Sequence, residues 1–224
     1  MPLVDLSDVL NHVLAEVRLA PEELALQKLR ERARDFCQIT RAWQADAAAK
    51  TIAINTATYT IVSPIGEAEP VAIEYLAVAT VADTPVEAEP KSREWLDRSI
   101  SNWRTRAADD FRYFTQLTRS TFTFPGLPVV AGLANGLTYR LSLKPGPEGT
   151  EIDEDVWSEF YEVLATGAKA ELLVMDGERW ANVKRGADYR QQYIVGRTHA
   201  RIKVSRGYSD SEDHVVSPYR FGGR

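Results

Sequence analysis

Histidines, clustered carboxylates and one cysteine are the side chains in this sequence that could do chemistry. The three histidines, His12, His199 and His214, lie far apart, and no two of them have the spacing of metal ligands. A hydrolase or transferase needs a nucleophile, a base and a group that orients them, and histidine commonly supplies one of these. Residues 132–136 lack the lysine and the spacing of a phosphate-binding glycine loop. No catalytic constellation emerges from these residues.

The carboxylate clusters and the cysteine have simpler explanations than catalysis. Acidic residues 153–155 suit a helix entrance, where the helix dipole favours negative charge. Residues 210–214 could bind a cation, but they lack the glycine and the ligand spacing of a calcium loop. Cys37 lies beside an apolar helical stripe, which favours a core role over a nucleophilic one. We therefore expect no enzyme activity, no cofactor and no metal, with an enzyme dependent on Asp153 or His199 as an open alternative.

Apolar spacing predicts two helices at each end of the chain. Ser7 caps a short amphipathic helix that ends near Leu19, and Pro21 opens the second helix. The third helix enters at residues 153–155, and the fourth is capped by Asn182 and ends near Ser205. The predicted buried stripes are Leu26, Leu29, Ala33, Phe36, Thr40 and Trp43 in the second helix, Val156, Phe160, Leu164, Ala168 and Leu172 in the third, and Ala187, Tyr189, Tyr193, Ile194 and Ala200 in the fourth.

Between these helix pairs, apolar residues alternate with polar ones as they do in strands. The predicted strands contain Ile52 and Ile54, Tyr59 and Ile61, Val71, Ile73 and Tyr75 on one face, Thr121 to Phe124, and Leu137, Tyr139, Leu141 and Leu143. A short helix after Ser92, followed by a strand, fits residues 92–117. Neither outer helix pair can bury its stripe alone, so the two pairs must pack together.

The predicted fold class is therefore α+β: a four-helix bundle with an inserted antiparallel β domain and an extended C-terminal tail. The domain boundaries follow the change in period: residues 1–49 and 150–206 for the bundle helices, 50–149 for the β-rich domain, and 207–224 for the tail. The tail is polar, rich in glycine and without apolar periodicity.

Charge is unevenly distributed in a chain whose formal net charge is −5. Residues 67–97 are acidic, and residues 182–206 are basic. The acidic residues are Glu67, Glu69, Glu74, Asp83, Glu87, Glu89, Glu94 and Asp97; the basic ones are Lys184, Arg185, Arg190, Arg197, Arg201, Lys203 and Arg206. Two solvated faces would explain this pattern, and so would complementary contact surfaces.

Targeting signals are not evident in the sequence. The amino terminus lacks the basic start and the apolar run of a signal peptide, and no apolar stretch reaches membrane-spanning length. Cys37 is the single cysteine, so the chain cannot form an internal disulfide. We expect a protein made in a cytoplasm, with no membrane partner.

Several segments together resemble the head-to-tail adaptor proteins of tailed phages, of the tail-tubular-protein kind found in short-tailed viruses. The second helix closes with Phe36, Cys37 and Trp43, and the segments TFTFPGLP (121–128) and LTYRLSLKP (137–145) are similar to the paired strands of that family. The third helix carries Gly167 and Ala168, and after a break come Trp180 and a helix that contains tyrosine. Residues 92–110 depart from the family pattern because they are longer and more helix-like. The resemblance covers residues 10 to about 206.

The resemblance implies a structural virion protein at the head–tail junction. It implies a helical bundle plus a β domain, a homo-oligomeric ring of twelve copies beneath the portal protein, a tail nozzle or tail tube protein as the partner below, and double-stranded DNA passing through the lumen without specific binding. In such a ring each subunit uses two different faces, so the acidic β region and the basic last helix could be complementary partners.

Two sets of contact residues follow from these expectations. Arg190, Arg197, Arg201 and Gly167 are candidates for contacts between subunits, although Gly167 suits a helix crossing within the chain equally well. Tyr208, Tyr219, Arg220 and Phe221 are candidates for docking to the portal, since tyrosine and arginine commonly dominate interfaces. A nucleic-acid-binding module that uses the basic last helix is the alternative function, against which the overall acidity argues.

Overall fold

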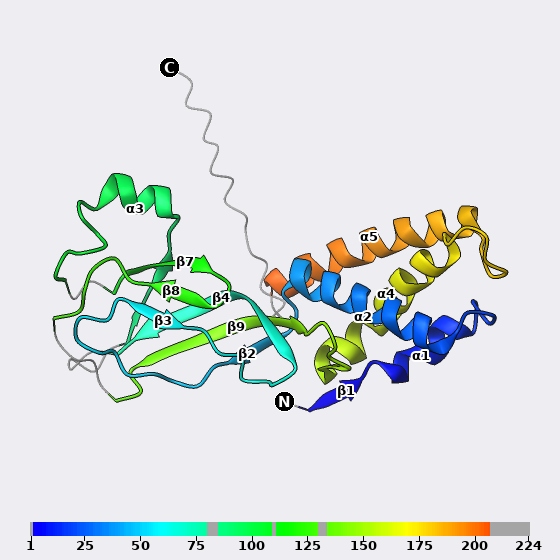
Figure 1. The fold of residues 1–224 in the computed structure, drawn as a ribbon, viewed down its shortest axis with the longest axis horizontal. Coiled ribbons are helices and arrows are strands. Elements are labelled where there is room, and N and C mark those ends of the chain that lie inside the picture. The colour runs from blue at the N-terminus through cyan, green and yellow to red at the C-terminus, as the bar shows by residue number, and fades with distance from the viewer. Residues whose placement is uncertain (1, 80–84, 109–110, 130–133, 207–224) are drawn as a thin grey trace, which may run out of the picture.

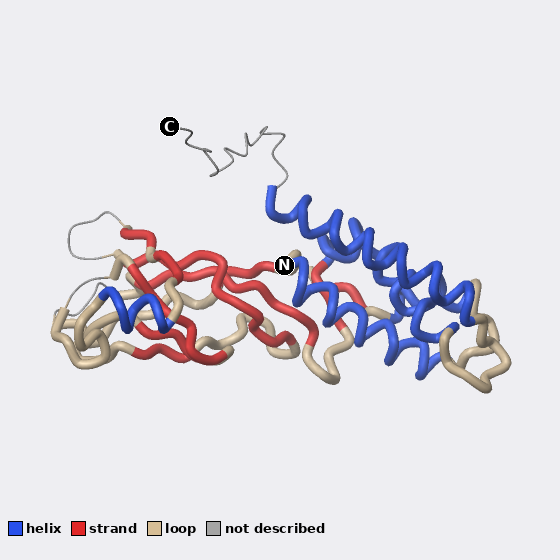
Figure 2. Tube along the Cα trace, turned by 90° about the horizontal axis from the view of Figure 1, so that it is seen from above, coloured by secondary structure: helices blue, strands red, loops and turns tan. Residues whose placement is uncertain are grey.

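The computed structural model describes residues 2–79, 85–108, 111–129 and 134–206. The molecule is elongated, with most of the helices at one end and most of the strands at the other (Figure 1). Figure 2 shows the same division after a quarter turn. Among the described residues there are five helices and ten strands, and the strands form three sheets.

The helical end consists of α1 (Ser7–Leu14), α2 (Glu22–Thr40), α4 (Glu154–Leu173) and α5 (Val183–Arg206). The apolar stripe predicted for α4 is buried throughout, and that of α2 is buried except for the half-buried Leu26, although α2 ends before Trp43. The stripe predicted for α5 is partly wrong: Tyr193 and Ala200 are buried, but Ala187 and Ile194 are exposed, because the buried side of this helix follows Gly186, Tyr193 and Ala200. The prediction that α1 continues to Leu19 is wrong, because the chain turns after Leu14. Ser7 is the first residue of α1 rather than its cap, and its backbone N–H donates to Asp5 Oδ1 at 2.7 Å.

The strands form one two-stranded sheet and two four-stranded sheets. In the first, β1 (Leu3–Asp5) pairs with β10 (Glu151–Asp153). The second has the order β2 (Gln44–Asp46), β9 (Leu137–Pro145), β4 (Ala68–Val78) and β5 (Val86–Glu87); the third has the order β3 (Thr58–Thr60), β8 (Thr121–Thr123), β7 (Tyr113–Thr118) and β6 (Glu89–Pro90). The pairs are antiparallel as predicted, except β6 with β7, which is parallel.

The strand β9 shows why alternation predicts some strands well and others poorly. Its four predicted residues, Leu137, Tyr139, Leu141 and Leu143, are all buried. In β4, by contrast, the register against β9 shifts between Ile73 and Tyr75. Ile73 lies opposite the buried Leu141, whereas Tyr75 lies opposite Arg140 and is 42% exposed. The placing of Tyr75 on the same face as Ile73 is therefore wrong, because an irregularity in the strand reverses the face.

The short helix α3 (Arg93–Ser99) follows Ser92, as the sequence predicts. The Ser92 hydroxyl accepts a hydrogen bond from the backbone N–H of Trp95 at 3.2 Å, which satisfies a free donor at the start of the helix. Within the described ranges, no helix has both the length and the apolar character needed to cross a membrane.

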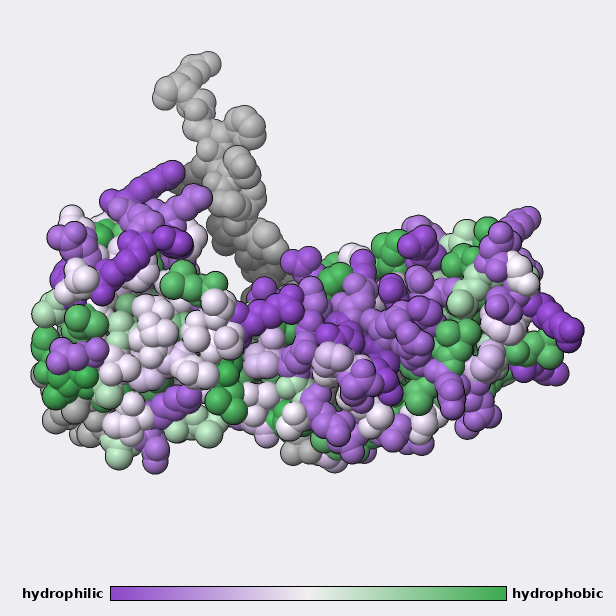
Figure 3. Space-filling view, viewed as in Figure 1, coloured by the Kyte–Doolittle hydropathy of each residue, from purple (hydrophilic) through white to green (hydrophobic). Residues whose placement is uncertain are grey.

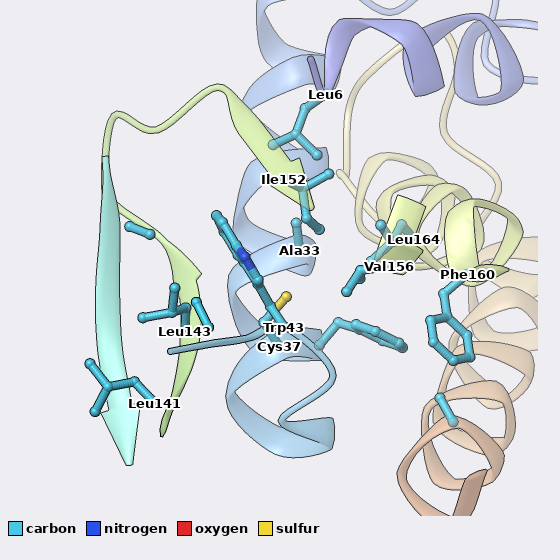
Figure 4. Packing of buried hydrophobic residues seen from close by; sticks show 14 of the residues in the cluster. Leu6, Ala33, Cys37, Trp43, Leu141, Leu143, Ile152, Val156, Phe160 and Leu164 are labelled. Carbon is cyan, nitrogen blue, oxygen red and sulfur yellow. The ribbon is translucent and has the colours of Figure 1, made fainter. Parts of the chain in front are cut away.

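The predicted four-helix bundle with an inserted β domain is wrong, although the broader α+β character agrees with the structure. Most of the buried apolar residues form one cluster, which runs from Leu6 through the helices to Leu141 in the sheet. Phe36 of α2 meets Phe160 of α4 at 5.2 Å between ring centroids, and Trp43 lies between α2 and the leucines of β9 (Figure 4). Because α2 packs on both α4 and β9, helices and sheet share one core.

Candidate functional site

The helix α5 carries most of the basic residues singled out in the sequence, and its start is as predicted. The Asn182 side chain accepts a hydrogen bond from the backbone N–H of Arg185 at 3.1 Å, and its carbonyl accepts one from Gly186 at 2.8 Å. A β-carbon added at Gly186 would lie 2.7 Å from the Val174 side chain. The small residue therefore lets α5 lie close against the end of α4.

Gly167 provides a second close approach between α4 and α5. A β-carbon built there would lie 2.8 Å from Cδ2 of Tyr193, which is itself buried. The Tyr193 hydroxyl donates to Asp35 Oδ2 at 2.8 Å, and burial raises the pKa of this phenol well above its ordinary value. Gly167 thus permits a close approach of Tyr193 from the same chain. A role for Gly167 in contacts between subunits stays a prediction.

Arg197 belongs to the same cluster of side chains. Its guanidinium lies 2.5 Å from Asp35 Oδ2 and 5.3 Å from the centre of the Tyr193 ring. The side chain is only 22% exposed. Its charge is therefore largely used within the chain, where it joins α5 to α2.

Arg190 and Arg201 differ from Arg197, because both are exposed and neither has an ion-pair partner among the described residues. Arg190 lines a hollow of about 190 Å³ between α2, α4 and α5. Arg201 lines a groove of about 480 Å³ at the carboxyl end of α2, together with Arg41 and Arg140. Among the predicted contact residues, these two have side chains that a partner could reach.

The remaining basic residues of α5 divide in the same way. Arg185 and the Tyr189 hydroxyl both contact Glu16, whose pKa is lowered chiefly by the hydrogen bond from Tyr189. Lys203 pairs with Glu159. Among the described residues, the cations of α5 without an ion-pair partner are Lys184, Arg190, Arg201 and Arg206.

Four of the eight acidic residues of the β region pair with cations of the same chain. Glu69 pairs with Arg34 at 3.2 Å and with Lys144 at 3.4 Å, and Glu74 pairs with Arg41 at 3.3 Å. Glu89 and Asp97 pair with Lys91 and Arg104. Asp83 lies outside the described residues. The acidic residues of this stretch that have no ion pair in the described part of the chain are Glu67, Glu87 and Glu94.

A second acidic surface was missed because its residues come from both ends of the chain. β1 pairs with β10 so that Asp5 lies directly opposite Glu151. The acidic face, as we define it, consists of six exposed carboxylates of β1, α1, β10 and α4: Asp5, Asp8, Glu151, Glu154, Asp155 and Glu162. None of the six has an ion-pair partner within the described ranges. Like charges opposite one another on paired strands repel, so this face favours a cationic neighbour.

The residues considered for catalysis lie in separate places. Asp153 is buried and caps α4 by accepting from the backbone N–H groups of Asp155 and Val156, and burial raises its pKa. Cys37 is buried as predicted, and the loss of solvent raises the pKa of its thiol. His12 lies against Tyr161 with their ring centroids 4.9 Å apart, and His199 is on α5; both histidines are exposed. In the described part of the chain, no group of histidine, cysteine and carboxylate side chains could hold a metal ion.

The predicted portal-docking residues, Tyr208, Tyr219, Arg220 and Phe221, lie outside the described residues, as do residues 130–133 and the acidic cluster 210–214. A scan against models of known protein families and a search of curated proteins found no match to this chain.

Proposed function

We propose that this chain is a structural virion protein, a head-to-tail adaptor that forms a ring beneath the portal of a tailed virus. The ring joins the head to a tail nozzle or tail tube protein, and double-stranded DNA passes through its lumen. The observation that carries the proposal is the outer surface of α5, where exposed aliphatic side chains lie among unpaired cations. Apolar side chains mixed with arginine are typical of the centre of a protein interface.

The resemblance of the second helix, the paired segments and the Gly167 helix to phage adaptors gives this interface its biological setting. The elongated shape also suits an adaptor, because the helical end and the sheet end offer two different surfaces to two different partners (Figure 1). Formation of the ring and binding to the portal both depend on protein surfaces rather than on a catalytic pocket.

The test is binding to the cognate portal protein. Purified chain and portal are mixed and separated by size, with each protein alone as a control. We expect the chain to elute with the portal and in several copies per portal ring. A chain that never joins the portal at micromolar concentrations would contradict the proposal.

The C-terminal segment is proposed to make part of the portal contact, through Tyr208, Tyr219, Arg220 and Phe221. A chain that ends at Gly207 should still fold, because the hydrophobic core cluster lies within residues 6–200. We expect this shortened chain to lose binding to the portal. If it is retained as well as the full chain, the docking surface lies in the helices.

A nucleic-acid-binding module is the second candidate, and the unpaired cations of α5 favour it. The two functions differ in their response to salt. A module that grips DNA through Lys184, Arg190, Arg201 and Arg206 should bind DNA tightly at low salt and lose affinity steeply as salt rises. An adaptor whose lumen only conducts DNA should show weak binding that does not depend on sequence.

A further inference from the structure

The outer face of α5 combines apolar and basic side chains that nothing else in the described chain covers. Ile194, Val195 and Ile202 are 41%, 43% and 44% exposed. The cations Lys184, Arg190, Arg201 and Arg206 lie on the same helix without ion-pair partners in the described ranges. Figure 3 shows that hydrophilic residues dominate the helical end in this view, with apolar residues between them along the α5 edge. We call these seven residues the α5 outer face.

The spacing of these residues forms two neighbouring stripes. Arg190, Ile194 and Arg201 follow the spacing i, i+4 and i+11, which brings them to one side of the helix. Lys184, Val195 and Ile202 follow i, i+11 and i+18, which defines the adjacent side. A partner that fits this face must therefore supply both negative charge and apolar contact.

The acidic face of the same chain supplies both. The same elements carry a half-buried aromatic group, in which Trp157 and Tyr161 of α4 stack at 5.7 Å and His12 of α1 lies against Tyr161. The Tyr161 hydroxyl donates to Glu162 at 3.2 Å, which joins the aromatic group to the carboxylates. Trp and Tyr commonly anchor interfaces, because each buries a large area with little loss of side-chain freedom.

Part of the acidic face lies across the helical end from α5, on β1, β10 and α1, and the rest lies on α4. In Figure 1, α5 runs along one edge and β1 and α1 run along the other, with α2 and α4 between them. Two different, complementary faces of one subunit produce a head-to-tail contact, and such contacts close into rings when the rotation between subunits allows it.

We propose that the acidic face of one copy docks onto the α5 outer face of the next copy. This inference rests on the proposed ring, and it names the surfaces that build it. It replaces the acidic β region as the partner of α5, because Glu69, Glu74 and Asp97 are already paired within their own chain. The acidic face carries six carboxylates without such partners, against four free cations on α5.

The size of α5 indicates how strong one such contact can be. A helix of 24 residues is about 36 Å long, and a strip about 11 Å wide along it covers roughly 400 Å². A stable interface commonly buries about 800 Å² on each partner. One contact is therefore weak by itself, and assembly depends on concentration or on a template that holds several copies together.

Charge reversal on the full chain tests the pairing. The double variants Arg190→Glu with Arg201→Glu, and Glu154→Lys with Asp155→Lys, should each raise the dissociation constant of self-association about tenfold or more in sedimentation velocity at low salt. Mixing the two variants should restore association, because the reversed surfaces are again complementary. The matched control, Glu67→Lys with Glu87→Lys, changes two exposed carboxylates of the β region and should leave self-association unchanged.

Chemical cross-linking provides a second measurement for a weak contact. Cys37 is buried, so a bismaleimide should react only with introduced cysteines. Chains carrying Asp155→Cys and Ile202→Cys should form mixed dimers, whereas Glu67→Cys should not cross-link to Ile202→Cys.

Each result has a separate meaning. Reversals that leave association and cross-linking unchanged, or a wild-type chain that neither associates nor cross-links, overturn the proposed pairing. Loss of portal binding with intact self-association overturns the adaptor function and leaves the pairing in place. Circular dichroism of each variant shows that the fold is retained.

Discussion

At the scale of single residues, α4 and α5 pack closely where Tyr193 meets Gly167. The ring cannot move easily, because its hydroxyl is held by Asp35 and its face lies against Arg197. Any side chain at position 167 must therefore displace either the ring or the whole of α5.

We predict that Gly167→Ala destabilises the protein. The new β-carbon would lie 2.8 Å from the Tyr193 ring, closer than side chains normally approach, and overpacking of this kind costs about 1–3 kcal/mol. Urea denaturation followed by circular dichroism measures the change. Gly66→Ala is the matched control, since nothing lies within 4 Å of a β-carbon there. Equal stability of the two variants would contradict this account of the α4–α5 contact.

At the scale of the helix α5, its arginines have two different tasks. Arg197 stabilises the packing of α5 on α2 through Asp35, whereas Arg190 is exposed and has no ion pair in the described part of the chain. Reversing both at once would mix a loss of stability with a loss of assembly. The structure separates these effects.

We predict that Arg197→Glu lowers the melting temperature, because it places a carboxylate beside Asp35 and leaves Tyr193 without its cation. The loss of a partly buried ion pair and its replacement by repulsion should cost about 1–3 kcal/mol. Arg190→Glu should leave the melting temperature within about 1 °C of the wild type, since exposed charges contribute little to stability. Differential scanning calorimetry at low protein concentration compares the two variants. If Arg190→Glu lowered the melting temperature more than Arg197→Glu, Arg190 rather than Arg197 would be the arginine that stabilises the packing of α5.

The sequence predicted the elements far better than it predicted their partners. Helical stripes report on local spacing, so Val156, Phe160 and Leu164 in α4 were predicted to be buried and are buried. The prediction that Asn182 caps α5 also depends only on neighbouring residues in the sequence, and it is confirmed. The irregular register at Tyr75 was not predictable, because it depends on how β4 aligns with β9.

Ion pairs between distant elements were also beyond local patterns. The sequence places Glu74 in an acidic stretch, whereas in the fold Arg41, which follows α2, forms an ion pair with it. The acidic face was hidden for the same reason, since Asp5 and Glu151 become neighbours only when β1 pairs with β10. Charge counted along the chain therefore identified the basic helix, but it could not show which acidic residues are paired within the chain.

At the scale of the whole molecule, Trp43 connects the helical end to the sheet end. It follows α2 directly, it is 1% exposed, and its carbonyl accepts a hydrogen bond from the backbone N–H of Leu143 in β9 at 2.8 Å. Figure 4 shows the indole between α2 and the strands. A single core that includes this residue implies that helices and sheets unfold together.

We predict that Trp43→Ala lowers the stability of both ends by the same amount, about 3–5 kcal/mol, because it leaves a large cavity at their junction. Helix content followed by far-ultraviolet circular dichroism, and the fluorescence of Trp103, which lies in the β-rich end, should change in one coincident transition for wild type and variant. Phe substitutions at Trp95 and Trp157 in all variants reduce the fluorescence background. Trp180→Ala, in the connection between α4 and α5, is the control and should have a much smaller effect, since this tryptophan is only half-buried. A shared core couples the unfolding of one end to the unfolding of the other. Two separate transitions, with only one shifted by Trp43→Ala, would therefore show that the helical end and the sheet end fold independently.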